Sequence, residues 1–413
     1  MNAPLELLCP AKGMECLQAA LRFGADAVYV GGPMLQLRAA STGFSMETLA
    51  RAARLVHSRG KRLYVTVNAF PTNKEIDALG DYAQALLALG ADAAIVADLG
   101  AVSAIRRAAP ALPIHISTQA NCQNYAAAMA YFDMGATRIV LGREMTLDQI
   151  HELRLKTPSA LELEAFVHGA MCMAWSGRCM ISAHLTGRSA NRGACTQPCR
   201  WNYSVVEEKR PGEYFPVEED GKGTAIFSSR DLCCLDFLDQ IIEAGVTAFK
   251  VEGRMKSPYY IATVTNAYRH RLDDLAAGRS SEASMALLNR ELDAVSHRRY
   301  SSGFYFSPPG HHLPDDGAYL QGCTFAGVVT ERLPDGRGRV ELRNRIHDGQ
   351  YIEVLSPRHL GRGFKASGMT LTDGTPIEAA AIPMMLFDLD LPSWAEPGDM
   401  LRLPLSGPGC PGE

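Results

Sequence analysis

Four cysteines lie within one segment near the middle of the chain. They are Cys172, Cys179, Cys195 and Cys199, spaced as C-x6-C-x15-C-x3-C. Four thiolates from one loop can close around a metal centre, because each supplies a soft anionic ligand. Structural zinc sites favour closely spaced cysteine pairs, and only the last two of these approach that spacing. Iron–sulfur clusters accept scattered ligands, so the spacing favours a cluster over zinc.

Another interpretation of the cysteines stays open. Free cysteines in reduced proteins are often small buried hydrophobic residues. That interpretation suits the isolated residues Cys16, Cys122, Cys323 and Cys410. The adjacent pair Cys233 and Cys234 is intermediate, since either could be a further ligand.

The same segment is rich in basic and aromatic residues. Arginines pair with phosphates and aromatic rings stack on unpaired bases, the combination expected of a loop that binds single-stranded RNA. No acidic residue occurs between Cys172 and Glu207. The alternative is a solvated loop whose arginines offset the charge of a thiolate-ligated cluster. The residues expected to contact RNA are Arg178, Arg188, Arg192, Arg200 and Trp201.

Polar residues also follow several strand-like runs. His168 directly precedes the cysteine segment and is the preferred acid–base or substrate-contact residue. Arg254, in the run VEGRMK, could bind a carboxylate through two parallel hydrogen bonds. Glu252 and Arg143 complete the candidate catalytic set, although any of these could equally make a structural hydrogen bond or ion pair. Other polar residues at such positions are Asn68, Asp98, His115, Gln119 and Glu144.

These residues need a scaffold that brings the ends of strands together. Strand-like runs alternate with amphipathic helical stretches such as Ser45–Ser58 and Asp77–Leu89. Eight such units favour a closed TIM-type (β/α) barrel, with an open doubly wound sheet as the alternative. In a barrel the carboxyl ends of the strands face the active site. The expected strands are Glu6–Pro10, Ala27–Gly31, Arg62–Asn68, Ala93–Asp98, Ile114–Gln119, Arg138–Arg143, Leu161–His168 and Ala248–Gly253.

Two segments interrupt the alternation. The first is a cysteine-rich insertion over residues 170–225, and Ala225–Asp231 after it could add a strand to the count. The second begins near Asp316, where short strand runs are separated by Asp-Gly and Pro-Gly turns. Typical runs are Cys323–Thr330, Arg339–Leu342, Tyr351–Leu355 and Met400–Leu403. We therefore expect an α/β barrel catalytic domain over residues 1–315, which includes the insertion, and a small all-β domain, a β-barrel, over residues 316–413.

Composition, the first residues and net charge indicate the expected compartment and partners. The 413 residues are 47% hydrophobic and 21% charged, as in ordinary soluble proteins. The first residues have no basic n-region and no long apolar run, so we expect a cytoplasmic protein without a membrane partner. The formal net charge of −4 gives no global attraction to phosphate, and nucleic-acid binding would need a local basic patch.

The combined motifs resemble those of the collagenase-like peptidase U family. The matching stretches run from LLCPAKG through HGAMCMAWSGRC, GACTQPCRW, FSSRDL and FKVEGRMKSPYY to VELRNRIHDGQYIEVLSP. Members of that family share a barrel and a cysteine-bound 4Fe-4S cluster. The segments RPGEY, STQANCQN and RRYSSGFYF are most similar to the branch that forms 5-hydroxyuridine at the wobble position of tRNA, with prephenate as the hydroxyl source.

The resemblance implies specific ligands and partners. The cluster would be held by Cys172, Cys179, Cys195 and Cys199, with Cys233 as an alternative fourth ligand because some ubiquinone-branch members use that position. It also implies tRNA, a small dicarboxylate co-substrate and the iron–sulfur assembly machinery as partners. The chain departs from the family pattern at Cys9, Gly142 and Trp175, and the peptide between Tyr203 and Ala225 is shorter than in the tRNA branch.

Two other functions remain from the same resemblance. The first is a collagenase-like peptidase, although the chain has neither an H-E-x-x-H zinc helix nor a G-x-S-x-G elbow. A cysteine–histidine pair from distant segments would still permit it. The second is a scaffold or hydroxylase subunit in oxygen-independent ubiquinone biosynthesis.

Overall fold

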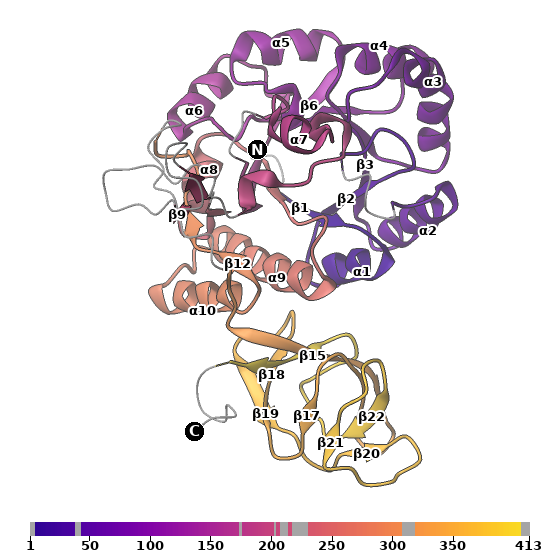
Figure 1. Ribbon diagram of the computed structural model, residues 1–413, viewed down its shortest axis with the longest axis vertical. Coiled ribbons are helices and arrows are strands. Elements are labelled where there is room, and N and C mark those ends of the chain that lie inside the picture. The colour runs from indigo at the N-terminus through magenta and orange to yellow at the C-terminus, as the bar shows by residue number, and fades with distance from the viewer. Residues whose placement is uncertain are drawn as a thin grey trace. The chain divides into compact units, whose positions relative to one another are not determined.

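The protein forms two compact units. The computed structural model describes residues 5–37, 43–172, 176–201, 204–206, 214–216, 230–307 and 319–405, without the side chains of 200, 204–206 and 214–216. One unit comprises residues 1–21, 25–256 and 298–318, and the other residues 22–24, 257–297 and 319–413 (Figure 1). This division groups residues 257–297 with the C-terminal strands, whereas the sequence placed the boundary near residue 316.

The first unit is a closed barrel of eight parallel strands, as the sequence predicted. Strand β11 pairs with both β1 and β7, which closes the sheet and rules out the open alternative. Several strands end earlier than expected, so that Asn68, Asp98 and Arg143 lie on the connections that follow them and Gln119 lies in the short helix after β5. The barrel strands are β1 (Glu6–Ala11), β2 (Ala27–Gly31), β3 (Arg62–Val67), β4 (Ala93–Val96), β5 (Ile114–Ile116), β6 (Ala136–Val140), β7 (Glu162–Ala170) and β11 (Ala248–Val251).

Helices alternate with these strands and surround them (Figure 1). Ser45 caps α2 as predicted, whereas α3 begins at Asn73 rather than Asp77 because Thr72 and Glu75 form a capping box. None of the described helices is both long enough and apolar enough to cross a membrane. The helices are α1 (Met14–Arg22), α2 (Met46–His57), α3 (Asn73–Ala88), α4 (Leu99–Ala108), α5 (Tyr125–Asp133), α6 (Leu147–Leu155) and α8 (Leu238–Glu243), the last preceded by η4 (Leu235–Phe237).

A further strand extends the sheet beside β7. Strand β10 (Asp231–Cys233) runs antiparallel to the end of β7 and parallel to β13 (Tyr300–Ser301). It takes no part in closing the barrel. Of the extra strand expected over 225–231, Asp231 lies in β10, Arg230 precedes it, and residues 225–229 lie outside the described residues.

Charged side chains from four barrel strands form a buried cluster inside the barrel. Arg138 on β6 lies 2.6 Å from Glu6 on β1 and 3.0 Å from Glu164 on β7. Lys250 on β11 lies 2.6 Å from the other oxygen of Glu164 and 4.5 Å from the ring centre of Tyr29. Burial lowers the pKa of Lys250, and the carboxylate of Glu164 opposes that shift. The cluster therefore links β6 and β7 to β11 and β1, the strands whose pairing closes the barrel.

The second unit contains two helices and an antiparallel sheet. The guanidinium of Arg402 on β23 is buried and lies 2.7 Å from Glu291 on α10 and 3.0 Å from Glu353 on β18. Apolar residues such as Phe387 and Leu401 fill the core of the sheet. The expected all-β domain is confirmed. Seven of its described strands pair as one sheet in the order β19-β18-β23-β15-β16-β22-β20, and β17 and β21 pair separately.

Four strands of this unit begin at or within one residue of the position that the sequence predicted. Those predicted from Cys323, Arg339, Tyr351 and Met400 are β15, β16, β18 and β23. The elements are α9 (Pro258–Ala276), α10 (Glu282–Asp293), β15 (Cys323–Arg332), β16 (Gly338–Leu342), β17 (Ile346–His347), β18 (Tyr351–Leu355), β19 (Arg362–Lys365), β20 (Thr370–Leu371), β21 (Ala379–Ala380), β22 (Leu386–Leu389) and β23 (Met400–Pro404), and the short strands β12 (His297–Arg298) and β14 (Tyr319–Leu320) lie between α10 and β15.

The buried charge cluster leads to a stability prediction. Glu164→Gln keeps the shape of the side chain but leaves Lys250 without its closest carboxylate. We expect the free energy of unfolding to fall by about 3 kcal/mol, because an uncompensated buried charge is costly. Urea unfolding of the wild type and the variant measures the difference.

The matched control is Glu152→Gln. Glu152 also pairs with a lysine, Lys156, but both side chains are exposed on α6. This variant should unfold like the wild type, because exposed pairs contribute little. Equal stability losses in the two variants would show that the buried cluster has no special role.

Candidate active site at the barrel mouth

Polar side chains meet at the carboxyl ends of the barrel strands. The side-chain amide of Asn68, just after β3, donates to the hydroxyl of Ser117, just after β5, at 3.2 Å. The same hydroxyl accepts a hydrogen bond from the backbone N–H of Gln119 in η1 (Thr118–Ala120). His115, one residue before the end of β5, is buried, and burial holds its pKa well below the usual value. The convergence expected at the mouth of the barrel is therefore present for Asn68 and Gln119, whereas the ring of His115 packs 4.7 Å from that of Tyr64, next to the buried charge cluster.

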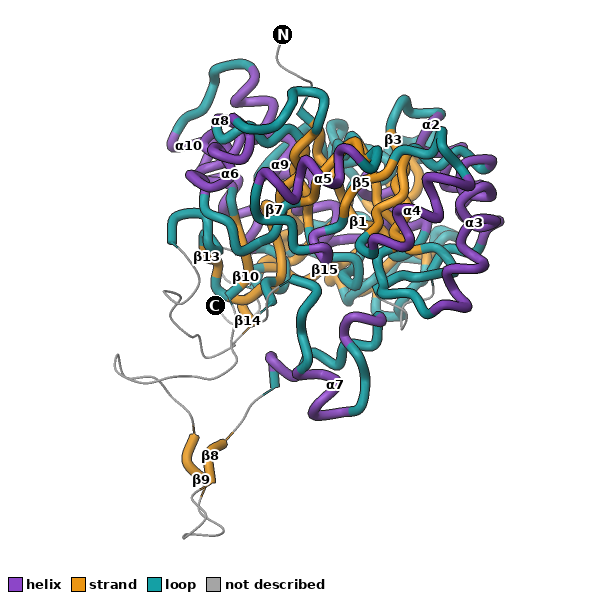
Figure 2. The backbone as a smooth tube through the Cα atoms, turned by 90° about the horizontal axis from the view of Figure 1, so that it is seen from above, coloured by secondary structure: helices purple, strands orange, loops and turns teal. Residues whose placement is uncertain are grey.

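The cysteine segment lies across this mouth. Its described helices are α7 (Ile181–Thr186), η2 (Ala190–Arg192) and η3 (Pro198–Arg200), and the short strands β8 (Ser204–Val206) and β9 (Tyr214–Pro216) follow. Figure 2 shows α7 standing beyond one end of the barrel strands. The backbone N–H of Phe70 donates to the carbonyl of Asn191 at 3.2 Å, and Arg192 donates back to the carbonyl of Phe70 at 2.6 Å. The segment is thus attached to the loop after β3.

Two glycines let the segment approach the barrel closely. A Cβ atom on Gly177 would lie 2.0 Å from the carbonyl oxygen of Gln119, and one on Gly193 would lie 2.5 Å from that of Gln36. Both glycines have positive φ values, 73° and 85°, which other residues rarely adopt. The carboxylate of Glu144 also accepts a hydrogen bond of 2.6 Å from the backbone N–H of Ser176. Sequence reasoning missed the role of these glycines, although the G-R-C and G-x-C motifs contain them.

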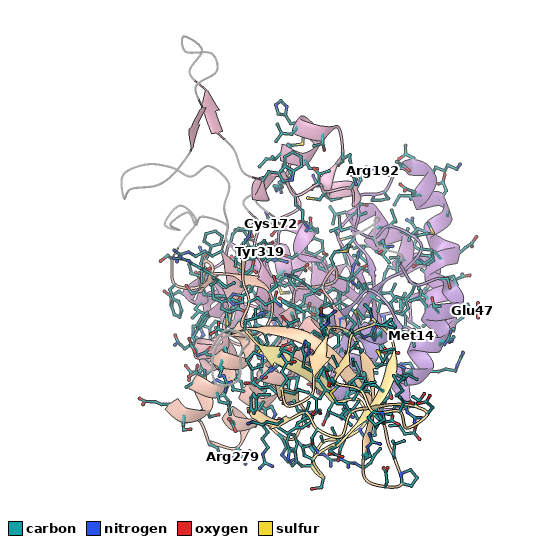
Figure 3. The ribbon with its side chains drawn as sticks, turned by 60° about the horizontal axis from the view of Figure 1, so that its bottom comes forward. Met14, Glu47, Cys172, Arg192, Arg279 and Tyr319 are labelled. Atoms are coloured by element: carbon teal, nitrogen blue, oxygen red, sulfur yellow. The ribbon has the colours of Figure 1, made fainter. Side chains whose placement is uncertain are left out.

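The predicted ligands occupy the surface of this segment. Cys172 follows β7 and is exposed, whereas Cys179, Cys195 and Cys199 are partly exposed. Figure 3 shows Cys172 on the same side of the barrel as Arg192. Cys195 accepts a hydrogen bond from the backbone N–H of Gln197 at 3.4 Å, an arrangement that suits a thiolate.

The donor set fits an iron–sulfur cluster in its chemistry, since all the thiols are accessible and belong to adjoining segments. In the residues that the structure describes, no three Cys, His, Asp or Glu side chains lie close enough to share one metal ion. The clustering of the four cysteines therefore stays a prediction.

Cys233 lies beside the proposed histidine. It is paired with His168 across the antiparallel strands β10 and β7. Directly opposite residues place their Cβ atoms close together on the same face of a sheet. His168 is buried, and its ring centre lies 5.4 Å from that of Tyr300. A histidine and a thiol therefore share one face at the end of β7.

The candidate catalytic residues fall into two groups. Arg143 lies 3.7 Å from Glu252 and stacks over the ring of Phe166, and the backbone N–H of Glu252 donates to the carbonyl of His168 at 2.8 Å. A β-bulge between β11 and β7 occurs at this point, a feature common beside active sites. Arg254 instead is buried and donates to Thr66 at 2.9 Å and to Gln36 at 3.1 Å. His168, Arg143 and Glu252 are thus together, and Arg254 is apart from them.

The residues predicted to bind RNA differ in their surroundings. Arg178 and Arg188 are exposed, and Trp201 exposes 47% of its surface. Arg192 is occupied with the carbonyl of Phe70 and with Glu75, 3.3 Å away, so it holds the segment to the barrel. The side chain of Arg200 lies outside the described residues, as do Trp175 and Tyr203 entirely.

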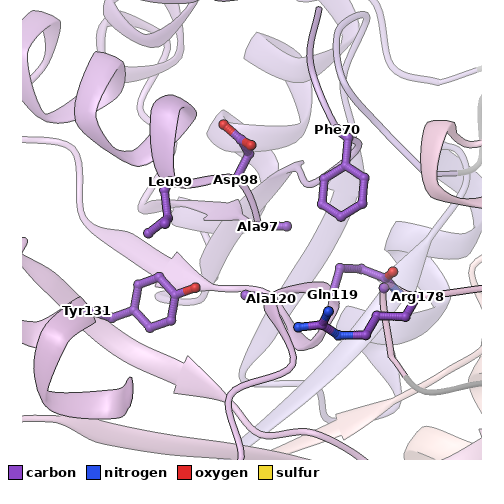
Figure 4. Close-up of a pocket in the computed structure, with 9 residues that line it drawn as sticks. Phe70, Ala97, Asp98, Leu99, Gln119, Ala120, Tyr131 and Arg178 are labelled. Carbon is purple, nitrogen blue, oxygen red and sulfur yellow. The ribbon is translucent and has the colours of Figure 1, made fainter. Parts of the chain in front are cut away.

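A pocket of about 330 Å³ lies beside the segment (Figure 4). Sequence reasoning missed the two aromatic residues of its wall, Phe70 and Tyr131, because neither stands in a motif. Burial raises the pKa of Tyr131, which keeps its hydroxyl protonated. The pocket is lined by Phe70, Ala97, Asp98, Leu99, Gln119, Ala120, Tyr131, Gly177 and Arg178.

Comparison with known proteins agrees with this architecture. The model of peptidase family U32 matches residues 12–314, and that of the U32 C-terminal domain matches residues 321–402. The chain belongs to peptidase family U32. The tRNA hydroxylation protein P of Escherichia coli K12 is 34% identical over 86% of this chain and 86% of that protein.

Other relatives carry different names. The tRNA hydroxylation protein P1 of Bacillus subtilis 168 is 33% identical over 96% of this chain and 94% of its own length. A protein of Porphyromonas gingivalis W83 named collagenase is 29% identical over 97% of this chain and 94% of its own length. U32 family membership alone therefore does not fix the reaction.

The close approach of Gly177 leads to a second prediction. In Gly177→Ala the added Cβ would collide with the backbone of Gln119, so the segment should detach from the mouth. We expect hydrogen exchange of the amides in residues 177–201, followed by mass spectrometry, to become at least about tenfold faster, as local opening requires.

Gly187→Ala supplies the control. Gly187 is in the same segment, has a similar φ of 69° and has no neighbour within 4 Å of an added Cβ. Both variants share the backbone strain of a left-handed alanine, about 1 kcal/mol. If both variants exchange at the same rate, steric contact at Gly177 does not hold the segment.

Proposed function

We propose that this U32 protein hydroxylates RNA, forming 5-hydroxyuridine at the wobble position of tRNA with prephenate as the source of the hydroxyl group. The proposal is carried by the similarity, over most of the chain, to proteins named for tRNA hydroxylation. The site adds physical support. Exposed Arg178, Arg188 and Trp201 lie on the segment that covers the mouth, where they can bind phosphates and stack on bases.

A 4Fe-4S cluster is part of the proposal. Cys172, Cys179 and Cys195 would hold it, with Cys199 or Cys233 as the fourth ligand. A bound cluster would supply a centre for electron transfer. The arginines of the segment would offset the negative charge of the thiolates.

The proposal places the co-substrate at one of two arginines, the partly buried Arg143 or the buried Arg254. Prephenate carries two carboxylates, which guanidinium groups bind well. Arg254 already donates to Thr66 and Gln36, and its surface is only 5% exposed. Arg143 donates to the carbonyl of Ala170 at 2.7 Å, but it faces the carboxylate of Glu252 only at 3.7 Å, a longer contact that an incoming carboxylate can replace. We therefore assign Arg143 to the co-substrate and His168 beside it to proton transfer.

A peptidase remains the second candidate, because of one specific observation. Cys233 and His168 are opposite each other on β10 and β7, and a thiol beside an imidazole can act as a nucleophile. A thiolate bound to a cluster could not also attack a peptide. The test is gelatin cleavage by the anaerobically purified wild type and by Cys233→Ser. If the wild type cleaves gelatin and the variant does not, the peptidase is favoured.

The main proposal predicts the content of modified tRNA. A strain without this protein should lack 5-hydroxyuridine derivatives in its tRNA, measured by nucleoside mass spectrometry. Wild type should restore them, whereas Cys172→Ala and Cys195→Ala should not. Cys122→Ala, a buried cysteine outside the segment, should restore them fully.

Iron and sulfide analysis of the anaerobically purified proteins assigns the fourth ligand. We compare Cys199→Ser with Cys233→Ser. Only the variant whose substituted cysteine is the fourth cluster ligand should lose iron. Undiminished 5-hydroxyuridine in the deletion strain would contradict the tRNA proposal and leave the quinone-scaffold alternative to be tested.

A further inference from the structure

The pocket beside the cysteine segment is built from four parts of the barrel mouth. Phe70 comes from the loop after β3, Asp98 from the end of β4, Gln119 from η1 after β5, and Arg178 from the segment itself. A volume of about 330 Å³ is at the small end for ligand pockets. It has room for a nucleoside-sized group and none for a paired stem.

Two aromatic rings form walls of this pocket. Tyr131 projects from α5 and Phe70 from the opposite side (Figure 4). The backbone of Phe70 is held by hydrogen bonds to Asn191 and Arg192, which ties this wall of the pocket to the cysteine segment. Aromatic faces of this kind stack on unpaired bases.

Two polar side chains, those of Asp98 and Gln119, also line the pocket. One oxygen of Asp98 accepts a hydrogen bond from the backbone N–H of Ala101 at 2.9 Å, which leaves the other oxygen to accept. The side-chain amide of Gln119 makes no hydrogen bond to another residue in the described part of the chain. An amide offers a donor and an acceptor, which complement the carbonyl and N–H on the edge of uracil.

The charge of Arg178 completes the arrangement. Its side chain is exposed at the rim of the pocket, where a guanidinium can pair with a phosphate. Arg178 also directly precedes the proposed ligand Cys179. A base in this pocket would therefore lie beside the thiol-bearing segment.

We propose that this pocket takes a single unpaired pyrimidine base, extruded from an RNA loop. Phe70 and Tyr131 stack on the base, Gln119 and Asp98 bind its edge, and Arg178 binds the adjacent phosphate. Extrusion is the usual way in which enzymes reach a base they modify. The assignment rests on the proposed function, because it names where that reaction holds its substrate.

The test uses photo-crosslinking, which does not need catalysis. An anticodon stem-loop with 4-thiouridine at the wobble position is irradiated with the anaerobically purified full-length protein, and the crosslinked peptides are mapped by mass spectrometry. We expect crosslinks to peptides that contain Phe70, Gln119 or Tyr131. Crosslinks confined to other parts of the chain would overturn the assignment.

Variants test the same point by affinity for the stem-loop. Tyr131→Ala and Gln119→Leu should each weaken binding about tenfold, since a stacked base or its edge contacts are lost. Tyr125→Ala is the matched control, because Tyr125 is on the same helix but is exposed and outside the pocket. If Tyr131→Ala and Tyr125→Ala bind equally well, while both keep the wild-type thermal unfolding, the pocket does not hold the base.

The two proposals can fail separately. If crosslinks map to the pocket but deletion does not change tRNA modification, the base site is supported and the proposed reaction is refuted. Loss of 5-hydroxyuridine upon deletion, with crosslinks elsewhere, would keep the reaction and refute the base site.

Discussion

A carboxylate buried between two cations constrains the whole barrel. Glu164 faces Arg138 on one side and Lys250 on the other, and Arg138 continues to Glu6 on the first strand. Buried charges are tolerated only when they are paired, so strands β1, β6, β7 and β11 must keep one register relative to one another. The closure of the barrel fixes the positions of the strand ends, and those ends carry the site.

The cysteine segment depends on those strand ends in turn. It contacts the barrel through Glu144, through the backbone of Phe70 and through two glycines that no larger residue could replace without a collision. The segment is therefore a part of the mouth rather than an appendage. Its thiols and exposed arginines lie where the parallel strands of a barrel normally present their catalytic groups.

A barrel of this kind does not by itself select a reaction, because function resides in the site. The relatives reflect this, since U32 proteins named for tRNA hydroxylation and for collagenase each match 86% or more of this chain. What distinguishes the alternatives is the use of a few groups. Cys233 opposite His168 could serve either a metal centre or a nucleophile, but not both at once.

The sequence by itself indicated eight strand–helix units, the C-terminal β-domain and the family, because these depend on periodicity and on local motifs. It also indicated the polar strand ends, such as Asn68. Closure of the strands into a barrel was decided only by the pairing of β11 with β1 and β7. Only the tertiary structure decided that Arg192 contacts Phe70 and Glu75, that Arg254 is occupied by Gln36 and Thr66, and that Tyr131 lines a pocket. Those facts depend on contacts between residues far apart in the chain, which no local pattern of residue types records.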